Sequence, residues 1–452
     1  MASIPVKEGQ TIKTHIVSIN AQGQGVAKVE GYVVFVNDAL PGEDCTIRVT
    51  KVLSKYAHAK VLGRDNESKL RVVPKCAHYE KCGGCQLQHI AYKAQLLLKQ
   101  KNVIDAFSKS RLDIKEKIMP TIGMERPWHY RNKVTFNVQK AGDKAVMGMY
   151  GEGSHRMTEI DKCYIIDEHL NVLLPVVRAH LKYLYAKEAL GTLPFEKVYG
   201  RVGKDRQMMA GLISQGDIHR YIDSLVVNLR RANNDIVSIF QNKSYDEGGN
   251  LSRDNTFLWG RESIDGEIGQ MEFDISPNSF FQVNTVQTQK LYEIISDFCS
   301  LQGDETVFDL YCGVGTIGMY VANDARKVFG IESVVDAVED AQKNAKRNNV
   351  RNIEFLKGDC EKMLPSLLNS EIYPDVAIID PPRKGCSNKF LDILAKTECK
   401  KIVYVSCNPA TLARDVKILA DKGYSVEKIQ PVDMFPHTYH VESVCLLEKL
   451  QT

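Results

Sequence analysis

The pattern of polar and apolar residues divides the chain into an N-terminal region of short strands and a C-terminal region of alternating helices and strands. Polarity alternates over Thr11–Ile19, as it does in a strand with one buried face. Glycine-containing turns near 23–28 and 38–43 precede further strand-like runs at 31–36 and 45–52. Short strands at this spacing predict a small β-barrel of the oligonucleotide-binding type. On pattern alone, a β domain without a ligand is the alternative.

From about residue 284 the rhythm changes to helices that alternate with short apolar strands. Such alternation predicts an α/β fold with a doubly wound, mostly parallel sheet, in which ligands bind at the carboxyl ends of the strands. Two strand-like segments close the chain and predict a hairpin at one edge of that sheet. The strands expected in the doubly wound sheet span 306–310, 327–331, 353–356, 376–379 and 402–405, and those of the hairpin span 426–431 and 441–447.

The region between these two has a mixed pattern. Helical periodicity covers 91–107 and 167–184, and short strand-like runs occur at 134–138, 146–150 and 236–240. We therefore expect a central α+β region, in which no repeat or low-complexity tract is evident.

Composition narrows the class of protein. The N-terminus lacks the apolar stretch of a secretion signal, and no apolar run approaches the roughly 20 residues of a membrane-spanning helix. We therefore expect a cytoplasmic protein outside the membrane, and a monomer. The 12 cysteines fit metal ligands, a reactive thiol and small buried residues better than a disulfide framework.

A net charge of +3 is only mildly basic, so binding to a polyanion needs a local basic patch. Basic residues mixed with aromatic ones occur at 51–71, 126–133 and 201–206. Such mixtures suit phosphate contacts and base stacking in folded RNA. Each stretch is equally compatible with an ordinary solvated surface.

A glycine-rich turn after the first strand of the doubly wound region indicates a nucleotide-type cofactor. Gly313, Gly315 and Gly318 fit the G-x-G-x-x-G pattern, and Glu332 ends the next strand, where a carboxylate can hold ribose hydroxyls. NAD, FAD and S-adenosylmethionine all fit these residues. Asp380, followed by two prolines, favours S-adenosylmethionine, because a rigid prolyl turn at a strand tip places a carboxylate near the reactive end of the cofactor.

Cys407 is the candidate nucleophile. It follows an apolar strand and precedes Pro409, a favourable residue for the first turn of a helix. A helix N-terminus lowers the pKa of a nearby thiol, so we expect a reactive thiolate here. Glu442 lies in a polar, aromatic loop that enters an apolar strand, and it is the candidate general base.

A second group of cysteines indicates a metal site. Cys76, Cys82 and Cys85 form a C-x5-C-x2-C pattern, and Cys163 lies in a later strand-like segment. Four thiolates can bind a four-iron, four-sulfur cluster or one zinc ion. The spacing matches neither common ferredoxin pattern, so a cluster, zinc and free thiols all remain open from the residues alone.

Five motifs in order resemble the RNA uridine carbon-5 methyltransferase family, and within it the ribosomal RNA type that carries an iron–sulfur cluster. The motifs are Phe281–Asn284, Asp309–Gly315, Asp380–Gly385, Ser406–Pro409 and His440–Ser443.

The N-terminal region adds to this likeness. It resembles a TRAM domain, an RNA-binding β-barrel, through Gly25–Lys28 and Leu40–Glu43. The resemblance thus covers nearly the whole chain.

The resemblance implies a site and a mechanism. Cys407 would add to carbon 6 of uracil, which activates carbon 5 towards the methyl group of S-adenosylmethionine, and Glu442 would then remove the carbon-5 proton. Phe280 and Phe281 are candidates to stack on the flipped base, although core packing is equally compatible. The four cysteines would hold a four-iron, four-sulfur cluster, with zinc as the alternative. The cofactor contacts would be Gln282, Tyr311, Gly313, Gly315, Glu332 and Asp380.

The family also implies a discontinuous arrangement of domains. Residues 1–63 would form the TRAM barrel, 64–91 and 125–262 the central domain with the cysteine site, and 92–124 and 263–452 the catalytic domain. Ribosomal RNA is the expected substrate. The alternatives are a transfer RNA uridine carbon-5 methyltransferase, a dehydrogenase with a nucleophilic cysteine, and a non-catalytic RNA-binding protein.

Overall fold

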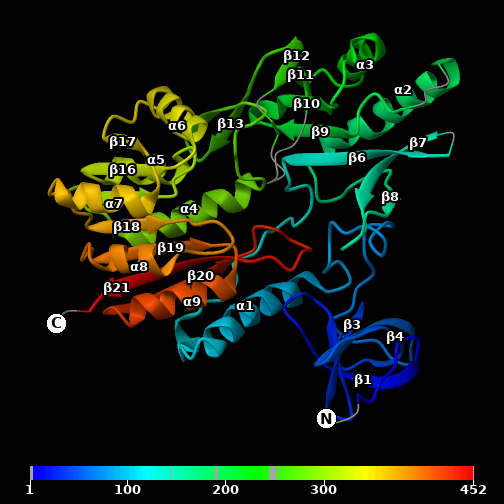
Figure 1. Ribbon diagram of the computed structural model, residues 1–452, viewed down its shortest axis with the longest axis horizontal. Coiled ribbons are helices and arrows are strands. Elements are labelled where there is room, and N and C mark those ends of the chain that lie inside the picture. Colours follow the sequence, from blue (N-terminus) through cyan, green and yellow to red (C-terminus); the bar gives the residue numbers. More distant parts are fainter. Residues whose placement is uncertain (1–3, 143, 189–191, 244–250, 253, 451–452) are drawn as a thin grey trace.

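The computed structural model contains a β-barrel, a central sheet with two helices, and a large sheet with helices on both faces (Figure 1). It describes residues 4–142, 144–188, 192–243, 251–252 and 254–450. The internal positions outside the described residues are 143, 189–191, 244–250 and 253, and all of them fall in the range 125–262 expected for the central domain.

The N-terminal barrel is closed, as the sequence predicted. Its strands are hydrogen-bonded in the order β1-β2-β3-β5-β4. Ile16, Val34 and Ile47 are fully buried, because alternate residues of each strand point into the barrel. The strands are β1 (Thr11–Ile19), β2 (Gly25–Val29), β3 (Tyr32–Asn37), β4 (Asp44–Val52) and β5 (Tyr56–Arg64).

Two kinds of contact fix the barrel to the segment that leaves it. The fully buried Glu43 carboxylate accepts hydrogen bonds from Arg71 Nε at 2.6 Å and Nη2 at 2.9 Å. Leu40 of the barrel joins a small apolar cluster with Leu87 and with Leu98 from helix α1 (Tyr92–Lys109). The barrel therefore has a defined position beside the rest of the molecule.

The central region forms one seven-stranded sheet in the order β12-β11-β10-β9-β6-β7-β8. It is larger than the sequence predicted, because runs such as Met208–Ile213 are buried throughout and show no alternation. The strands are β6 (Lys133–Ala141), β7 (Lys144–Tyr150), β8 (Met157–Glu159), β9 (Lys197–Val202), β10 (Met208–Ile213), β11 (Ile236–Asn242) and β12 (Asn255–Gly260). The helical segments here and just before are η1 (Lys115–Lys117), η2 (Glu168–Val172), α2 (Leu173–Glu188), η3 (Lys204–Arg206) and α3 (His219–Ala232).

The C-terminal region confirms the doubly wound sheet and its edge hairpin. Five parallel strands are followed by the antiparallel pair β21 and β20, in the order β17-β16-β15-β18-β19-β21-β20. The strands of this sheet are β15 (Thr306–Leu310), β16 (Lys327–Glu332), β17 (Ile353–Lys357), β18 (Val376–Ile379), β19 (Lys401–Ser406), β20 (Tyr424–Val432) and β21 (Glu442–Lys449). A separate hairpin, β13 (Ile264–Ile268) and β14 (Met271–Ile275), precedes it.

Helices cover both faces of this sheet (Figure 1). Within β18, Val376 and Ile378 belong to one apolar core, whereas Ala377 and Ile379 belong to the other. Helix α1 comes from far earlier in the chain, yet it packs against α9 on the second face. The helical segments of this region are α4 (Thr285–Cys299), α5 (Thr316–Val321), η4 (Ala322–Asp324), α6 (Val335–Arg347), α7 (Cys360–Asn369), α8 (Asn388–Ala395) and α9 (Pro409–Ala420).

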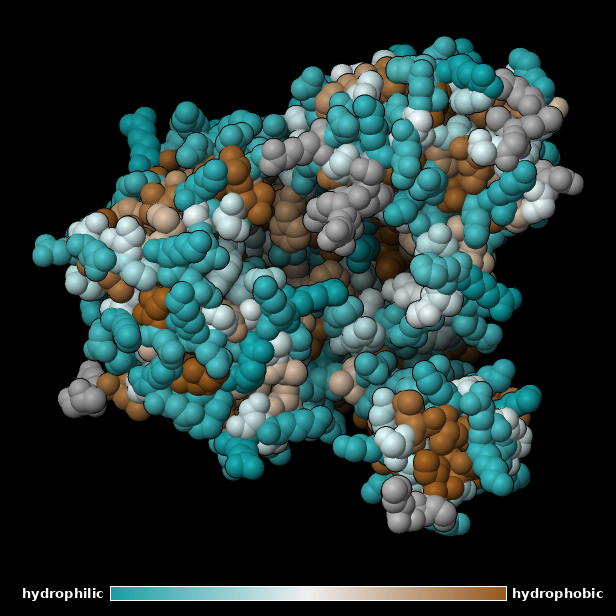
Figure 2. Space-filling view, in the orientation of Figure 1, coloured by the Kyte–Doolittle hydropathy of each residue, from teal (hydrophilic) through white to brown (hydrophobic). Residues whose placement is uncertain are grey.

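The surface is largely hydrophilic on the face that Figure 2 shows, and it is hollowed where the three regions approach one another. Within the described residues, no helix combines the length and the apolar character needed to cross a bilayer.

Candidate active site

The predicted site residues gather where the parallel strands end. Tyr311 follows β15, Glu332 ends β16, Asp380 follows β18 and Cys407 follows β19. β15 lies between β16 and β18, and β19 pairs with β18, so these four side chains follow consecutive strands of one sheet. The carboxyl edge of a doubly wound sheet is where such folds bind ligands.

The glycine turn after β15 has a backbone that few residues can adopt. Tyr311, Gly313 and Gly315 all have positive φ angles, of 65°, 55° and 75°. A Cβ at Gly315 would lie 2.4 Å from the ring of Phe355, so this position requires glycine. A Cβ at Gly313 would meet no protein atom within 4 Å, which leaves open space above the turn.

Glu332 fixes that turn. One carboxylate oxygen accepts a hydrogen bond from the Gly313 amide at 3.1 Å, and the other accepts one from the Val334 amide at 2.8 Å. The Ser333 hydroxyl also donates to this carboxylate, at 3.1 Å. A carboxylate has about four acceptor positions, so Glu332 retains one for a ligand hydroxyl.

Asp309, in β15, is a buried carboxyl that the sequence analysis did not single out. Its Oδ2 accepts a hydrogen bond from the Gly318 amide at 2.8 Å, and its Oδ1 has no partner among the described residues. Burial raises the pKa of Asp309 to about 7, although the Gly318 hydrogen bond opposes the shift. Burial likewise raises the pKa of Asp380 to about 7. Both carboxyls therefore titrate near neutrality.

A buried arginine shapes the segment that carries Gln282. Arg201 is fully buried and donates hydrogen bonds to the carbonyls of Ser279, at 2.8 Å, and Phe281, at 3.1 Å. Phe281 is only 4% exposed and packs in the core, whereas Phe280 is 64% exposed. Of the two phenylalanines, Phe280 presents its ring to solvent.

Cys407 is half-buried between β19 and α9. Burial raises the pKa of its thiol to about 11, and the charge of Glu442 adds to the shift while that of Arg383 opposes it. The prediction of a lowered thiol pKa is therefore wrong. The helix N-terminus does not outweigh the loss of water around the sulfur.

Glu442 begins β21 and is 9% exposed. Burial raises its pKa well above the ordinary range, Asp380 adds to this, and Arg383 opposes it. Arg383 is thus the cation that favours the charged forms of both Glu442 and Cys407. It is exposed and forms no ion pair within the part of the chain that the structure describes. In the sequence, this arginine stands out only as part of the Asp380–Gly385 motif.

The Cys407 thiol opens onto a pocket of about 580 Å³. Arg383 and His440 line it beside the cysteine. Burial lowers the pKa of His440 to about 4, so its imidazole is neutral at physiological pH. The other walls come from α1, which the family resemblance assigned to the catalytic part, and from the turn between β1 and β2, which no pattern in the sequence predicted to lie here.

The loop 433–441 that leads into Glu442 is held by buried groups from distant segments. Lys99 of α1 forms a fully buried ion pair with Asp433, and Tyr92 donates a hydrogen bond to the same carboxylate at 2.8 Å. The His437 carbonyl accepts from the Leu87 amide at 2.9 Å. Charged and polar pairs of this kind define one position for the loop.

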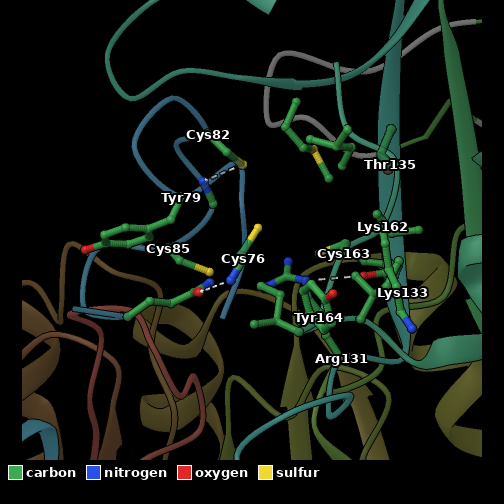
Figure 3. A pocket seen from close by; sticks show the side chains of 17 residues that line it. Cys76, Tyr79, Cys82, Cys85, Arg131, Lys133, Thr135, Lys162, Cys163 and Tyr164 are labelled. Atoms are coloured by element: carbon green, nitrogen blue, oxygen red, sulfur yellow. Dashed lines mark hydrogen bonds between the residues drawn. The ribbon is translucent and has the colours of Figure 1, made fainter. Parts of the chain in front are cut away.

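The four cysteines of the second group line one cavity of about 340 Å³. In Figure 3, Cys76, Cys82 and Cys85 approach from one loop, and Cys163 lies across the cavity from them. The described residues contain no group of three side chains placed to hold a single metal ion. Basic side chains also line the cavity: Arg131, Lys133 and Lys162.

Two predicted RNA-contact stretches contain residues that are not on the surface. Arg201 is buried, as described above, and Tyr130 is 7% exposed with its hydroxyl donating to the Pro436 carbonyl at 3.0 Å. Trp128 stacks on His437 with ring centroids 3.7 Å apart. Tyr130 and Trp128 support the active-site loop, whereas Arg201 supports the segment before α4. At the buried positions Arg201 and Tyr130 the surface interpretation is wrong.

Comparison with known proteins identifies the family. The sequence matches the family described as tRNA (Uracil-5-)-methyltransferase over residues 91–450 and the TRAM domain over residues 5–62. An uncharacterized RNA methyltransferase of Clostridium tetani is 39% identical over 451 residues, which cover 98% of this chain and 97% of that protein. One from Halalkalibacterium halodurans is 40% identical over 451 residues, 98% of each chain.

A solved structure agrees with these matches. The tRNA (uracil-54, C5)-methyltransferase of Pyrococcus abyssi, in complex with S-adenosyl-L-homocysteine, is 26% identical, with a TM-score of 0.73 over 96% of this chain and 100% of that chain. A dehydrogenase and a non-catalytic RNA-binding protein are both excluded. The chain therefore belongs to the tRNA (uracil-5-)-methyltransferase family, and it is an S-adenosylmethionine-dependent RNA methyltransferase with an N-terminal TRAM domain.

Proposed function

We propose that the protein methylates carbon 5 of a uridine through a covalent bond between Cys407 and carbon 6 of the ring. The observation that carries this proposal is that Cys407, Glu442 and Arg383 lie together at the end of β19. The charge of Glu442 raises the pKa of Cys407, and the charge of Arg383 lowers the pKa of both. Carbon 5 of uracil is a weak nucleophile, and addition of a thiolate at carbon 6 places electron density on it.

Arg383 favours the first step, the addition of Cys407 to carbon 6. Its positive charge stabilises both the Cys407 thiolate and the enolate that forms on the ring. The thiol proton leaves to solvent. S-adenosylmethionine, when bound, would supply the methyl group to carbon 5 and leave as S-adenosylhomocysteine. Glu442 then takes the carbon-5 proton, and the bond from carbon 6 to Cys407 breaks to return the thiolate. Asp380 near Glu442 keeps the carboxylate a strong enough base for this step.

The test uses the two reactive residues separately. Cys407→Ala is expected to abolish methyl transfer while RNA binding and the melting temperature remain. Glu442→Gln is expected to accumulate an RNA–protein adduct that survives a denaturing gel, because the final proton cannot leave. Cys399→Ala, at the opposite end of β19, serves as the matched control. Methylation by Cys407→Ala would refute the mechanism.

We also propose that S-adenosylmethionine contacts Gln282, Tyr311, Gly313, Gly315, Glu332 and Asp380. Three observations support this proposal: these residues lie at the carboxyl edge of the sheet, the space above Gly313 is open, and Glu332 can accept a further hydrogen bond. Gly313→Ala is expected to lower the affinity for S-adenosylhomocysteine at least tenfold, as measured by calorimetry. Gly31→Ala is the control, because Gly31 in the barrel also has a positive φ and open space around it.

We propose a four-iron, four-sulfur cluster, and not zinc, for Cys76, Cys82, Cys85 and Cys163. The supporting observation is that all four line one cavity, although no three described side chains are placed around a single ion. A cluster is wider than a single ion, and the basic lining of the cavity suits its negative charge. The purified protein is expected to contain iron and sulfide, and Cys82→Ser to lose both. Zinc without iron would overturn the assignment.

We propose ribosomal RNA as the substrate, on the strength of the cysteine pattern that resembles ribosomal members. Transfer RNA is the second candidate, because the Pyrococcus abyssi relative acts on it. Mapping 5-methyluridine in both RNA classes from a deletion strain separates them: the missing modification identifies the substrate.

The division into three domains given above remains our proposal. The packing of α1 against α9 supports the return of residues 92–124 to the catalytic part.

A further inference from the structure

The pocket at Cys407 has a wall that belongs to the TRAM barrel. Asn20 and Gln22, in the turn between β1 and β2, line it together with the α1 residues Asn102 and Lys109. Its volume of about 580 Å³ lies well within the ~300–1,000 Å³ of pockets that enclose drug-sized ligands. This is more room than one flat pyrimidine ring requires, and part of the lining belongs to the barrel turn.

The turn that forms this wall is held in place. The Asn20 side chain accepts hydrogen bonds from the amides of Gln22, at 3.0 Å, and Gln24, at 2.9 Å. The Ala21 carbonyl accepts one from Asn102 Nδ2 at 3.1 Å, which joins the turn to α1. A Cβ at Gly23 would lie 2.3 Å from Leu87, so the turn also lies directly against the segment after the cysteines. The wall is therefore preorganised.

Some polar groups of the wall are left for a ligand. The side-chain amide of Gln22 is exposed and forms no hydrogen bond within the described residues. Lys109, in the last turn of α1, is exposed and has no ion-pair partner among them. Asp105 also lines the pocket, but its charge is offset by an ion pair with Lys101. On the side of the cysteine, the rings of Tyr439 and His440 lie 4.4 Å apart.

We propose that this part of the pocket is a binding subsite for the nucleotide next to the target uridine, in which Gln22 reads the base edge and Lys109 contacts a phosphate. Amide side chains form paired hydrogen bonds with base edges, and single-stranded RNA exposes those edges when its bases unstack. A lysine near the backbone positions the strand without reading its sequence. The proposal rests on the proposed function, because it places the target uridine at Cys407.

The experiment uses the full-length protein and short RNA oligonucleotides around the mapped target. An abasic residue replaces the neighbour on the 5′ side or on the 3′ side of the target. On one side the abasic residue is expected to raise KM of the wild type about tenfold, the size of one lost base contact, and to change kcat little. Gln22→Ala is expected to bind intact RNA about tenfold more weakly and to show no further abasic penalty. Equal abasic penalties in both proteins, or none in the wild type, would overturn the subsite.

Controls separate this proposal from its foundation. Gln10→Ala removes a similar amide elsewhere on the barrel and is expected to behave as the wild type. Lys109→Gln is expected to weaken RNA binding and to make it less dependent on salt. Lys93 is exposed on the first turn of α1, and Lys93→Gln is expected to change neither property. An equal loss of RNA affinity in both lysine variants would contradict the proposed contact between Lys109 and a phosphate. The affinities of intact and abasic RNA for the Cys407→Ala protein are also compared. This comparison tests the subsite even if the covalent mechanism fails.

Discussion

At the scale of single residues, the site is set by how burial and charge act on a thiol and a carboxyl. The pKa of Cys407 is raised to about 11 by burial and Glu442, and is held down by Arg383. A thiol is alkylated as its thiolate, so its rate of reaction rises with pH towards that pKa. We predict that iodoacetamide modifies Cys407 slowly at neutral pH. Arg383→Gln is expected to move the pH profile upward, and Glu442→Gln to move it downward.

The measurement is the rate at which the Cys407 peptide is labelled, followed by mass spectrometry from neutral to alkaline pH. Cys399, buried at the other end of β19, provides an internal reference. A profile with its midpoint below neutrality, or one that is unchanged in Arg383→Gln, would contradict this account of the site.

At the scale of elements, the loop before Glu442 depends on helix α1. Lys99 and Asp433 are both fully buried, and removing one partner leaves a buried charge. We predict that Lys99→Met costs about 3–5 kcal/mol of stability, and that Lys99→Met with Asp433→Leu costs clearly less. Lys101→Met breaks an exposed pair on the same helix and is expected to cost less than ~1 kcal/mol.

Hydrogen–deuterium exchange over 433–442 and chemical denaturation measure these effects. Faster exchange in that loop is expected for Lys99→Met and not for Lys101→Met. If the single and double variants lose the same stability, the buried pair does not position the loop.

The elements also show what sequence could predict. The strands near Asp380 and Cys407 were predicted because parallel strands are short apolar runs that end in motif residues. The Lys99–Asp433 pair joins residues more than 300 positions apart, and no local pattern reports such a contact. Arg201 was interpreted as a surface cation because periodicity does not reveal that two backbone carbonyls satisfy it in the core.

At the scale of the whole molecule, the barrel is attached through an ion pair that depends on pH. Burial alone would raise the pKa of Glu43, but hydrogen bonds from Arg71 and from backbone amides outweigh it, so the pKa is lowered. A lowered pKa stabilises the folded form above the ordinary value of 4.5, and this contribution is lost as pH falls through the lowered pKa. We predict that the barrel separates from the rest of the molecule in acid before the sheets unfold.

Small-angle scattering would show this as an increase in radius without loss of helical circular dichroism. Arg71→Ala is expected to show the same expansion at neutral pH. Lys13→Ala, which removes an exposed pair with Asp65, is the control. An Arg71→Ala protein as compact as the wild type would show that other contacts fix the barrel.

The central claim is the bond between Cys407 and the uracil ring, and a fluorinated substrate tests it most directly. With fluorine on carbon 5 there is no proton for Glu442 to remove, so the methylated adduct cannot break down. After incubation with S-adenosylmethionine and RNA that contains 5-fluorouridine at the target, we predict a stable complex whose digestion yields one methylated nucleotide on the Cys407 peptide. A nucleotide attached to another residue, or no covalent complex, would contradict the mechanism.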